Sequence, residues 1–418
     1  MVLRVDAGQL EALVAAIFEH GGCMRVEAER IAMRLLGANL TGHDSHGVLR
    51  TSRYIDWLKR GIFHAGRRVQ IDFNSDVLCI LDGQYGFGQT IGEQAVRLGL
   101  DKAATSGAAV VALNNSGHLG RIGDWAEMAA AEGYVSIHFV NARGSVLVAP
   151  FGGTEPRIST APFCVGVPRG DEPPVVLDFA TSVVAEGKVL VASKGGKPLP
   201  EGALIDQNGT LSSDPEVLYG TAGPDAPTTE RNGSGAIRAM GEHKGSGLAF
   251  ICELLGGSLT GNRATGLPNE QFANGMLSIY LSVEAFNRGG GFANDITRYI
   301  DYVKSANPAN PDEPVVVPGD KERQVKAERL ANGVPLTQEA WDDIRNAAKR
   351  VGLEDEDLSV AGVPAEVGLE WEGFEERKNH QEGCWWRGAA GRVVVGRLGD
   401  LPRSNTVHCD LRCQFNCQ

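Results

Sequence analysis

Hydrophobic residues recur at helical spacing in the first part of the chain. The first set lies three or four positions apart and stops before two glycines: Leu10, Leu13, Val14, Ile17 and Phe18. Since one turn of a helix takes about 3.6 residues, this spacing predicts an amphipathic helix. A second helix is predicted through Ile31, Leu35 and Leu36. With a third helix expected over residues 44–58, the pattern predicts an N-terminal helical unit that ends near residue 66.

From residue 69 the pattern changes to short apolar runs, which are typical of strands. Strands are expected at 69–73, 77–81, 108–113, 135–140, 158–167, 175–178 and 276–283. Helices are expected at 93–98, 124–131, 183–192, 246–259, 321–330 and 338–351. A run rich in Pro, Asn and Asp at 307–318 predicts a linker. Because strands and helices mix without a steady repeat, the pattern predicts an α/β or α+β fold.

The net charge and the positions of the cysteines indicate which partners and which cellular compartment suit the protein. A net charge of −12 disfavours nucleic acid and anionic membrane surfaces as partners. The chain shows no signal-peptide core and no apolar run of membrane-spanning length. We therefore expect a cytoplasmic protein, with reduced and buried cysteines at four scattered positions: Cys23, Cys79, Cys164 and Cys252.

The composition changes at about Glu354. Four cysteines crowd into the last 35 residues, and three of them follow His408 at a regular spacing: Cys409, Cys413 and Cys417. This spacing differs from the paired Cys-x2-Cys arrangement of common zinc sites, so we expect no metal site. Our hypothesis is that residues 354–418 form an atypical, poorly structured and dispensable tail.

The third predicted helix carries the first candidate chemistry. Asp44 or Ser45 is a predicted N-cap, and one face of the helix carries His46, Arg50, Arg53, Tyr54 and Trp57. An imidazole can exchange a proton near neutral pH, and a guanidinium fork binds a carboxylate bidentately. The face therefore suits a small carboxylic acid whose neighbouring carbon is oxidised or reduced. An exposed polar helix face is the alternative.

A second histidine, His118, lies in a glycine-rich turn between a predicted strand and a helix. Glycines let the backbone turn tightly behind such a side chain and present it to a ligand. Considered with His46 and Arg50, His118 is predicted to be a general acid or base. On its own, it would be a turn residue with a local hydrogen bond.

The common nucleotide-binding fingerprints are missing from the sequence. It contains neither Gly-x-Gly-x-x-Gly between a strand and a helix nor Gly-x4-Gly-Lys-Ser/Thr. Two other stretches could bind phosphate: residues 177–182, where a strand runs into a helix, and residues 241–247, a glycine-rich turn that contains Lys244. Free amides at a helix start suit an anion, although each stretch could equally be a plain capped helix.

Six motifs in fixed order resemble the malate/L-lactate dehydrogenase family of the non-Rossmann type, which includes ureidoglycolate, sulfolactate and hydroxycarboxylate dehydrogenases and diketogulonate reductase. They lie at residues 42–50, 115–121, 149–153, 177–182, 243–248 and 317–320. The sequence departs from the family pattern at two places, one expected to affect the shape of the substrate pocket and the other the contact with the cofactor ribose. Residues 159–162 read Ser-Thr-Ala-Pro where the family usually has Gly-Thr-Asn-Pro, and Asp320 replaces a usual Glu.

The resemblance implies a mostly antiparallel nucleotide-binding sheet beside a helical domain built from both chain ends, assembled as a homodimer. Residues 1–68 and 321–353 would form the helical domain, and residues 69–320 the domain that binds nucleotide and substrate. By resemblance, His46 and His118 are catalytic, and Arg50, Tyr54 and Thr160 bind substrate. The implied cofactor contacts are Asp178, Phe179, Ala180, His243, Lys244, Pro318, Gly319 and Asp320.

The activity implied by the resemblance is hydride transfer between NAD or NADP and a small 2-hydroxy or 2-oxo carboxylate such as malate or lactate. Arg50 would bind the carboxylate, one histidine would exchange the hydroxyl proton, and Lys244 would hold the pyrophosphate. Two alternatives stay open: a reductase of a cyclic imine or diketo acid on the same scaffold, and a non-catalytic homologue that only binds ligand.

Overall fold

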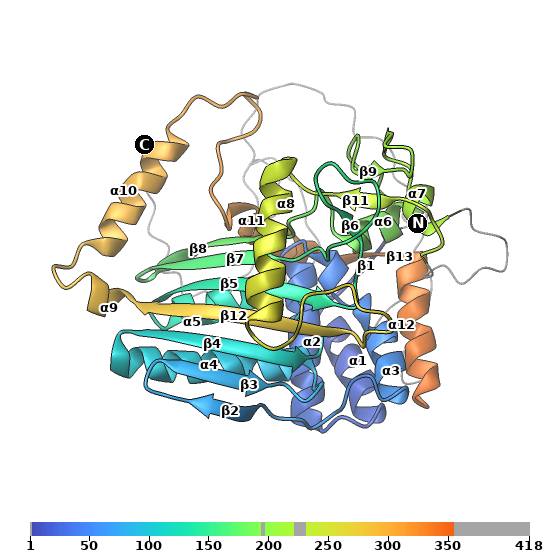
Figure 1. The fold of residues 1–418 in the computed structure, drawn as a ribbon, viewed down its shortest axis with the longest axis horizontal. Coiled ribbons are helices and arrows are strands. Elements are labelled where there is room, and N and C mark those ends of the chain that lie inside the picture. Colours follow the sequence, from blue (N-terminus) through green and yellow to red (C-terminus); the bar gives the residue numbers. More distant parts are fainter. Residues whose placement is uncertain (1, 194–196, 221–230, 355–418) are drawn as a thin grey trace, which may run out of the picture. The chain divides into compact units, whose positions relative to one another are not determined.

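A seven-stranded mixed sheet forms the centre of the fold (Figure 1). The computed structural model describes residues 2–193, 197–220 and 231–354, all within one compact unit, Met1–Ala365. The expected tail beyond residue 354, with its four cysteines, lies outside the described residues.

The sheet is mostly antiparallel, as predicted. Its strand order is β2-β3-β4-β12-β5-β7-β8, and only the pair β3–β4 is parallel. The strands are β2 (Gln70–Asn74), β3 (Leu78–Asp82), β4 (Ala108–Ser116), β5 (Tyr134–Arg143), β7 (Phe163–Arg169), β8 (Glu172–Phe179) and β12 (Ala273–Ser282). A crossover through a single helix joins β3 to β4, so the sheet differs from the repeated parallel crossovers of a Rossmann fold.

Helices α4 (Gly88–Ser106) and α5 (Gly123–Ala131) pack against this sheet. Their shared core includes Trp125 and Tyr280, both fully buried. Helix α8 (His243–Cys252) continues as a π-helical turn, η2 (Glu253–Ser258), which also contacts the sheet. A Cβ at Gly275 of β12 would lie 2.1 Å from the carbonyl oxygen of Gly256, so strand and turn approach backbone to backbone.

The two ends of the described chain build one helical core. Its helices are α1 (Ala7–His20), α2 (Arg25–Leu40), α3 (Arg50–Lys59) and α12 (Gln338–Arg350). Helix α11 (Asp320–Asn332) contacts α2 but contributes no buried residue. Strand β1 (Val2–Val5) pairs with β13 (Val334–Thr337) and brings the C-terminal helices back to the start of the chain. Phe18, Tyr54 and Ile344 lie in this core. The division into domains at residues 68 and 321 stays a prediction.

A smaller four-stranded sheet, of order β10-β9-β11-β6, has a third core. Its strands and helices are β6 (Val148–Ala149), β9 (Leu204–Ile205), β10 (Leu211–Ser212), β11 (Ala236–Arg238), α6 (Glu186–Ser193) and α7 (Glu216–Tyr219). Two further helices, α9 (Val283–Phe286) and α10 (Phe292–Lys304), follow β12. None of the described helices combines the length and the apolar character needed to cross a membrane. The four described cysteines are buried and free of disulfides, as expected.

Several predicted boundaries were wrong for local reasons. The strand expected from residue 158 begins only at Phe163, because Ala161 has a φ of +28° and Pro162 follows it. Helix α6 begins at Glu186 rather than at residue 183, and α8 begins at His243 rather than at residue 246. Helix α10 was not predicted, although its apolar residues recur at helical spacing.

Candidate active site

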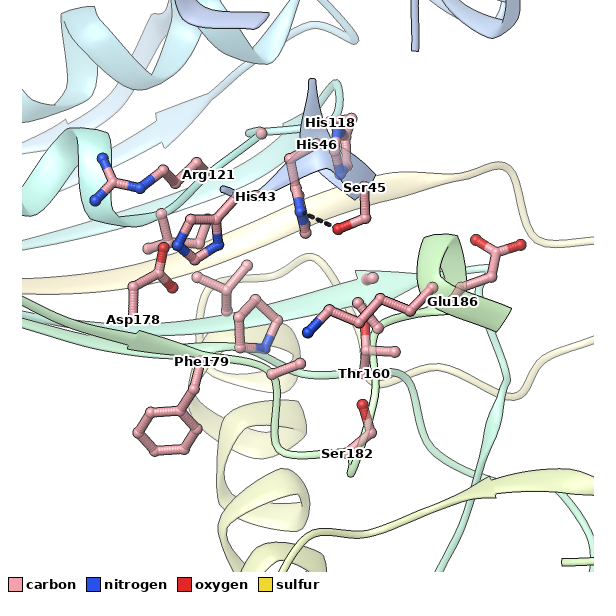
Figure 2. A pocket seen from close by; sticks show the side chains of 18 of the residues that line it. His43, Ser45, His46, His118, Arg121, Thr160, Asp178, Phe179, Ser182 and Glu186 are labelled. Carbon is pink, nitrogen blue, oxygen red and sulfur yellow. Dashed lines mark hydrogen bonds between the residues drawn. The ribbon is translucent and has the colours of Figure 1, made fainter. Parts of the chain in front are cut away.

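A cavity of about 600 Å3 lies where the helical core meets the central sheet. Its walls come from η1 (Asp44–His46), α3, the loop after β4, the end of β8 and the start of α6. Figure 2 shows His46 and His118 on one side of it and Thr160 and Ser182 on the other. Segments more than a hundred residues apart in sequence thus line one cavity.

The two histidines lie together in this cavity. The ring centroids of His46 and His118 are 5.4 Å apart, and their planes differ by 15°. The Ser45 hydroxyl is 2.9 Å from Nδ1 of His46, and the Tyr54 hydroxyl is 2.5 Å from Nδ1 of His118. Each ring is therefore oriented through Nδ1, and its other nitrogen is left for a ligand.

Both imidazoles are neutral in this environment. Burial, followed by the positive charge of Arg50, lowers the pKa of His46 to about 3. The same causes hold the pKa of His118 well below its usual range. A neutral imidazole has one nitrogen lone pair, so each ring can accept a proton only at the nitrogen that carries this lone pair. A bound carboxylate would oppose the charge of Arg50 and favour the protonated form.

Arg50 begins α3 beside these rings. Its Nε donates to the carbonyl oxygen of Ser45 at 2.6 Å, and within the described chain its two terminal nitrogens make no hydrogen bond. Arg53 lines the same cavity one turn later, with its NH1 3.7 Å from Oε2 of Glu186. The free fork of Arg50 has the geometry to bind a carboxylate bidentately.

The helix expected to carry His46 is interrupted. His46 ends the short 3-10 turn η1, and α3 begins only at Arg50 because Gly47 adopts an extended backbone. The predicted cap by Asp44 or Ser45 was wrong, since neither side chain caps α3. Asp44 instead accepts hydrogen bonds from Asn39 at 2.6 Å and from Arg329 at 2.5 Å.

Glycine packing places His118. A Cβ at Gly88, the first residue of α4, would lie 2.1 Å from the carbonyl oxygen of His118, so only glycine permits this approach. The turn is also held by Asn274, whose side-chain oxygen accepts from the backbone N–H of Leu119 at 2.9 Å. The start of α4 and strand β12 therefore fix the position of the His118 backbone beside the cavity.

The other side of the cavity carries Asp178, Phe179 and Ala180 at the end of β8. Asp178 accepts the backbone N–H of Gly123 at 2.7 Å and so binds the free amide end of α5. Burial raises the pKa of its carboxyl group. Thr160 lines the cavity, and its backbone oxygen accepts hydrogen bonds from Thr181.

Comparison with known proteins agrees with this arrangement. A family model described as malate/L-lactate dehydrogenase matches residues 5–345. This chain belongs to the malate/L-lactate dehydrogenase family. Hydroxycarboxylate dehydrogenase B of Escherichia coli (strain K12) is 38% identical over 363 residues, which cover 85% of this chain and 97% of that protein. Malate dehydrogenase of Pyrococcus abyssi is 31% identical and covers 84% of this chain and 96% of its own length.

Solved structures of the malate/L-lactate dehydrogenase family share the fold. Malate dehydrogenase from Pyrococcus horikoshii gives a TM-score of 0.74 at 27% identity and covers 84% of this chain and 97% of that one. Δ1-piperideine-2-carboxylate reductase from Pseudomonas syringae gives a TM-score of 0.68 at 27% identity. The match covers 83% of this chain and 100% of that one. Membership of a dehydrogenase family implies an oxidoreductase acting on hydroxy acids.

Some positions expected from the malate/L-lactate dehydrogenase motifs lie outside the cavity wall. His243 and Lys244 are exposed in the first turn of α8, where the His243 ring packs near Phe151. Pro318 and Asp320 do not line the cavity either, and Asp320 pairs with Lys304 at 2.8 Å. Gly319 lines a neighbouring pocket of about 280 Å3 that shares Thr41 and Glu322 with the main cavity. Tyr54 is fully buried and touches the site through His118.

The sequence analysis missed several residues at the site. Glu186 and Lys188 line the cavity from the first turn of α6, and their position just after the 177–182 motif could have indicated them. Phe272 lines it with its ring centroid 6.2 Å from that of His118. Gln89 donates to the Tyr54 hydroxyl at 3.2 Å. No sequence pattern indicates Phe272 or Gln89, because their partners are distant in the chain.

Proposed function

We propose that this chain transfers a hydride between NAD or NADP and C2 of a small 2-hydroxy or 2-oxo carboxylate. The observation that carries the proposal is the pair of stacked imidazoles, 5.4 Å apart, beside the free fork of Arg50 in one cavity. The names of the relatives, malate and hydroxycarboxylate dehydrogenases, agree with this substrate class.

The protein's part in the reaction is to orient the acid and to move one proton. Arg50 binds the substrate carboxylate through its two terminal nitrogens and so fixes the position of C2. His118 or His46 takes the hydroxyl proton during oxidation and returns it during reduction. The other ring donates a hydrogen bond to the oxygen. A bound nicotinamide dinucleotide supplies the hydride acceptor or donor.

The residues on the Asp178 side fit such a cofactor. A volume of about 600 Å3 is in the range of cofactor sites. Lys188 and Lys321 line the cavity, and within the described chain neither is paired with a carboxylate, so both are suited to a pyrophosphate. His243, Lys244 and residues 318–320 stay predicted contacts of the cofactor.

The charges around the histidines favour an acid with a second anionic group. Among the residues that the structure describes, three guanidinium groups surround the carboxylate of Glu186, from Arg50, Arg53 and Arg231. Burial opposes ionisation of Glu186, but Arg231, Arg50 and Arg53 outweigh it and lower its pKa to about 2. Two positive charges are therefore left over, and a dicarboxylate such as malate would neutralise both.

A second candidate is reduction of a cyclic imine that carries a carboxylate. It is favoured by the likeness to the piperideine-2-carboxylate reductase, which covers 83% of this chain. The same arginine would bind the carboxylate, and a histidine would give a proton to the ring nitrogen. Relative rates with an imine and an oxo acid distinguish the two candidates.

The proposal includes a cytoplasmic homodimer. Helix α8 and the turn that follows expose an apolar set that a second copy could cover: Phe250, Ile251, Leu254 and Leu259. The exposed fraction is 59% for Phe250 and 63% for Leu259. Light scattering of the intact chain measures the molar mass, and a monomer at micromolar concentration would contradict this part.

One assay tests the proposed reaction. Oxidation of NADH and of NADPH is followed with oxaloacetate, 2-oxoglutarate, pyruvate, phenylpyruvate and Δ1-piperideine-2-carboxylate. The proposal predicts turnover with at least one 2-oxo acid and the highest kcat/KM for a dicarboxylate. Binding of the cofactor without turnover of any oxo acid or imine would mean a non-catalytic homologue.

A further inference from the structure

A buried hydrogen-bonded chain of three side chains lies behind the cavity. Gln89 Nε2 is 3.2 Å from the Tyr54 hydroxyl, which is 2.5 Å from Nδ1 of His118. Gln89 is 1% exposed and Tyr54 is fully buried. The three members, from α4, α3 and the loop after β4, contact one another directly, so each proton in the chain can be assigned to a donor.

In the arrangement observed, the protons point toward His118. The amide N–H of Gln89 donates to the Tyr54 oxygen, so the single hydroxyl proton of Tyr54 is directed to Nδ1 of His118. Nδ1 is then an acceptor, and a neutral ring carries its proton on Nε2. In this form His118 offers the cavity a donor and cannot accept a proton from a substrate hydroxyl.

A proton-accepting His118 needs the opposite arrangement. Its Nδ1 must carry a proton, which it donates to the Tyr54 oxygen, and Tyr54 must then donate its own proton to another acceptor. The Gln89 carbonyl oxygen, Oε1, is buried and has no hydrogen-bond partner within the described residues. A half-turn of the Gln89 amide would exchange Nε2 for Oε1 and provide that acceptor.

We propose that the Gln89 amide, acting through the Tyr54 hydroxyl, selects which ring nitrogen of His118 carries the proton. Gln89 is thus a positioning residue for the acid–base step, and its unpaired oxygen is the acceptor used when His118 is ready to receive a proton or has received one. The turn of the amide itself transfers no proton. The change of tautomer also requires Nε2 of His118 to release its proton into the cavity and Nδ1 to take up one proton from solvent, so the number of protons on the three side chains is unchanged. The inference rests on the proposed function, with His118 as the acid or base.

Other groups around His118 set its basicity without distinguishing its two nitrogens. Arg50 and Arg53 of α3 and His46 of η1 face the ring, and their charges or potential charges lower its pKa. Phe272 contributes an apolar edge. These groups stay in place when Gln89 is changed, so a change in the pH profile reports on the chain of three side chains.

The test is the pH dependence of kcat/KM for oxidation of the best hydroxy acid by Gln89→Met, Tyr54→Phe and the double variant. Each single change removes support for the protonated ring, so we expect the apparent pKa to fall by about one unit and the maximal rate by roughly tenfold. The double variant should match Tyr54→Phe, because Gln89 acts only through Tyr54.

Gln94→Met is the matched control. Gln94 lies on the same helix, and its side-chain oxygen accepts the backbone N–H of Val69, the one hydrogen bond of this side chain among the described residues. An unchanged profile in Gln89→Met, or additive losses in the double variant, would overturn the inference and leave the proposed function intact. Absence of turnover in the unaltered chain would overturn the function itself.

Nitrogen NMR of the histidine rings in the unaltered, ligand-free chain measures which nitrogen of His118 carries the proton. This test needs no substitution, so its result does not depend on whether a variant folds. The proposal predicts that neutral His118 carries its proton on Nε2, because the Gln89 amide donates to Tyr54 in this state. A proton on Nδ1 would contradict it.

Discussion

Arg53 is the residue that distinguishes a dicarboxylate from a monocarboxylate in this account. It lines the cavity one turn after Arg50, and its contact with Glu186 is a long 3.7 Å. We predict that Arg53→Gln lowers kcat/KM for oxaloacetate by roughly tenfold, which corresponds to about 1.4 kcal/mol, and leaves that for pyruvate unchanged. Arg60→Gln, at the exposed end of α3, is the control. Equal losses with both acids would show that Arg53 serves the structure rather than the second acidic group.

His138 gives the fold a dependence on pH that is separate from catalysis. Its ring lies fully buried between Ser136 and Ser278, and burial lowers its pKa to about 3. The unfolded chain binds a proton at this histidine below about pH 6.5, whereas the folded chain does not. The free energy of unfolding should therefore fall as the pH drops below 6.5, by about 2 kcal/mol at pH 5 for this group alone.

Denaturant unfolding at pH 7 and pH 5 measures this effect. We expect His138→Gln to reduce the loss of stability between the two pH values, although His46 and His118 still contribute in the same direction. His20→Gln, at an exposed position, should leave the loss unchanged. An identical pH dependence in His138→Gln and the unaltered chain would refute the role of burial at this site.

At the scale of elements, the start of α4 positions the loop after β4, which carries His118. We predict that Gly88→Ala lowers kcat/KM by roughly tenfold or more, because the added Cβ would displace the backbone at His118. Gly37→Ala in α2, where a Cβ meets no atom within 4 Å, should leave activity unchanged. Full activity in Gly88→Ala would mean that the position of His118 tolerates this displacement.

The elements themselves were largely predictable from hydrophobic spacing. Helices α1 and α2 and strand β12 lie where their patterns predicted them, because each buries one continuous face. The helix at His46 was wrong because its geometry depends on Gly47, which packs against Asn39 from another helix. Such a contact between elements leaves no periodic signal in the sequence.

The candidate site was predictable by residue type and resemblance but not by geometry. His46, Arg50 and His118 could be singled out because imidazole and guanidinium suit an acid substrate. Their convergence depends on how α3 packs against the turn after β4. The hydrogen bond from Gln89 to Tyr54 spans 35 positions in sequence and likewise depends on packing.

For the whole molecule, the described core ends at Leu353, three residues after α12. Leu353 is 5% exposed and belongs to the core shared by both chain ends. We therefore predict that a chain truncated after Leu353 keeps its kcat/KM and its subunit number, as measured by the oxo acid assay and by light scattering. Loss of either would give residues 354–418 a role in activity or assembly.

The measurement that tests the central claim most directly is kcat for oxo acid reduction by the double variant His46→Asn, His118→Asn, with cofactor binding measured in parallel. If one of the two imidazoles exchanges the substrate proton, kcat falls by roughly two orders of magnitude or more while the cofactor still binds. A double variant that turns over at nearly the normal rate would contradict the account.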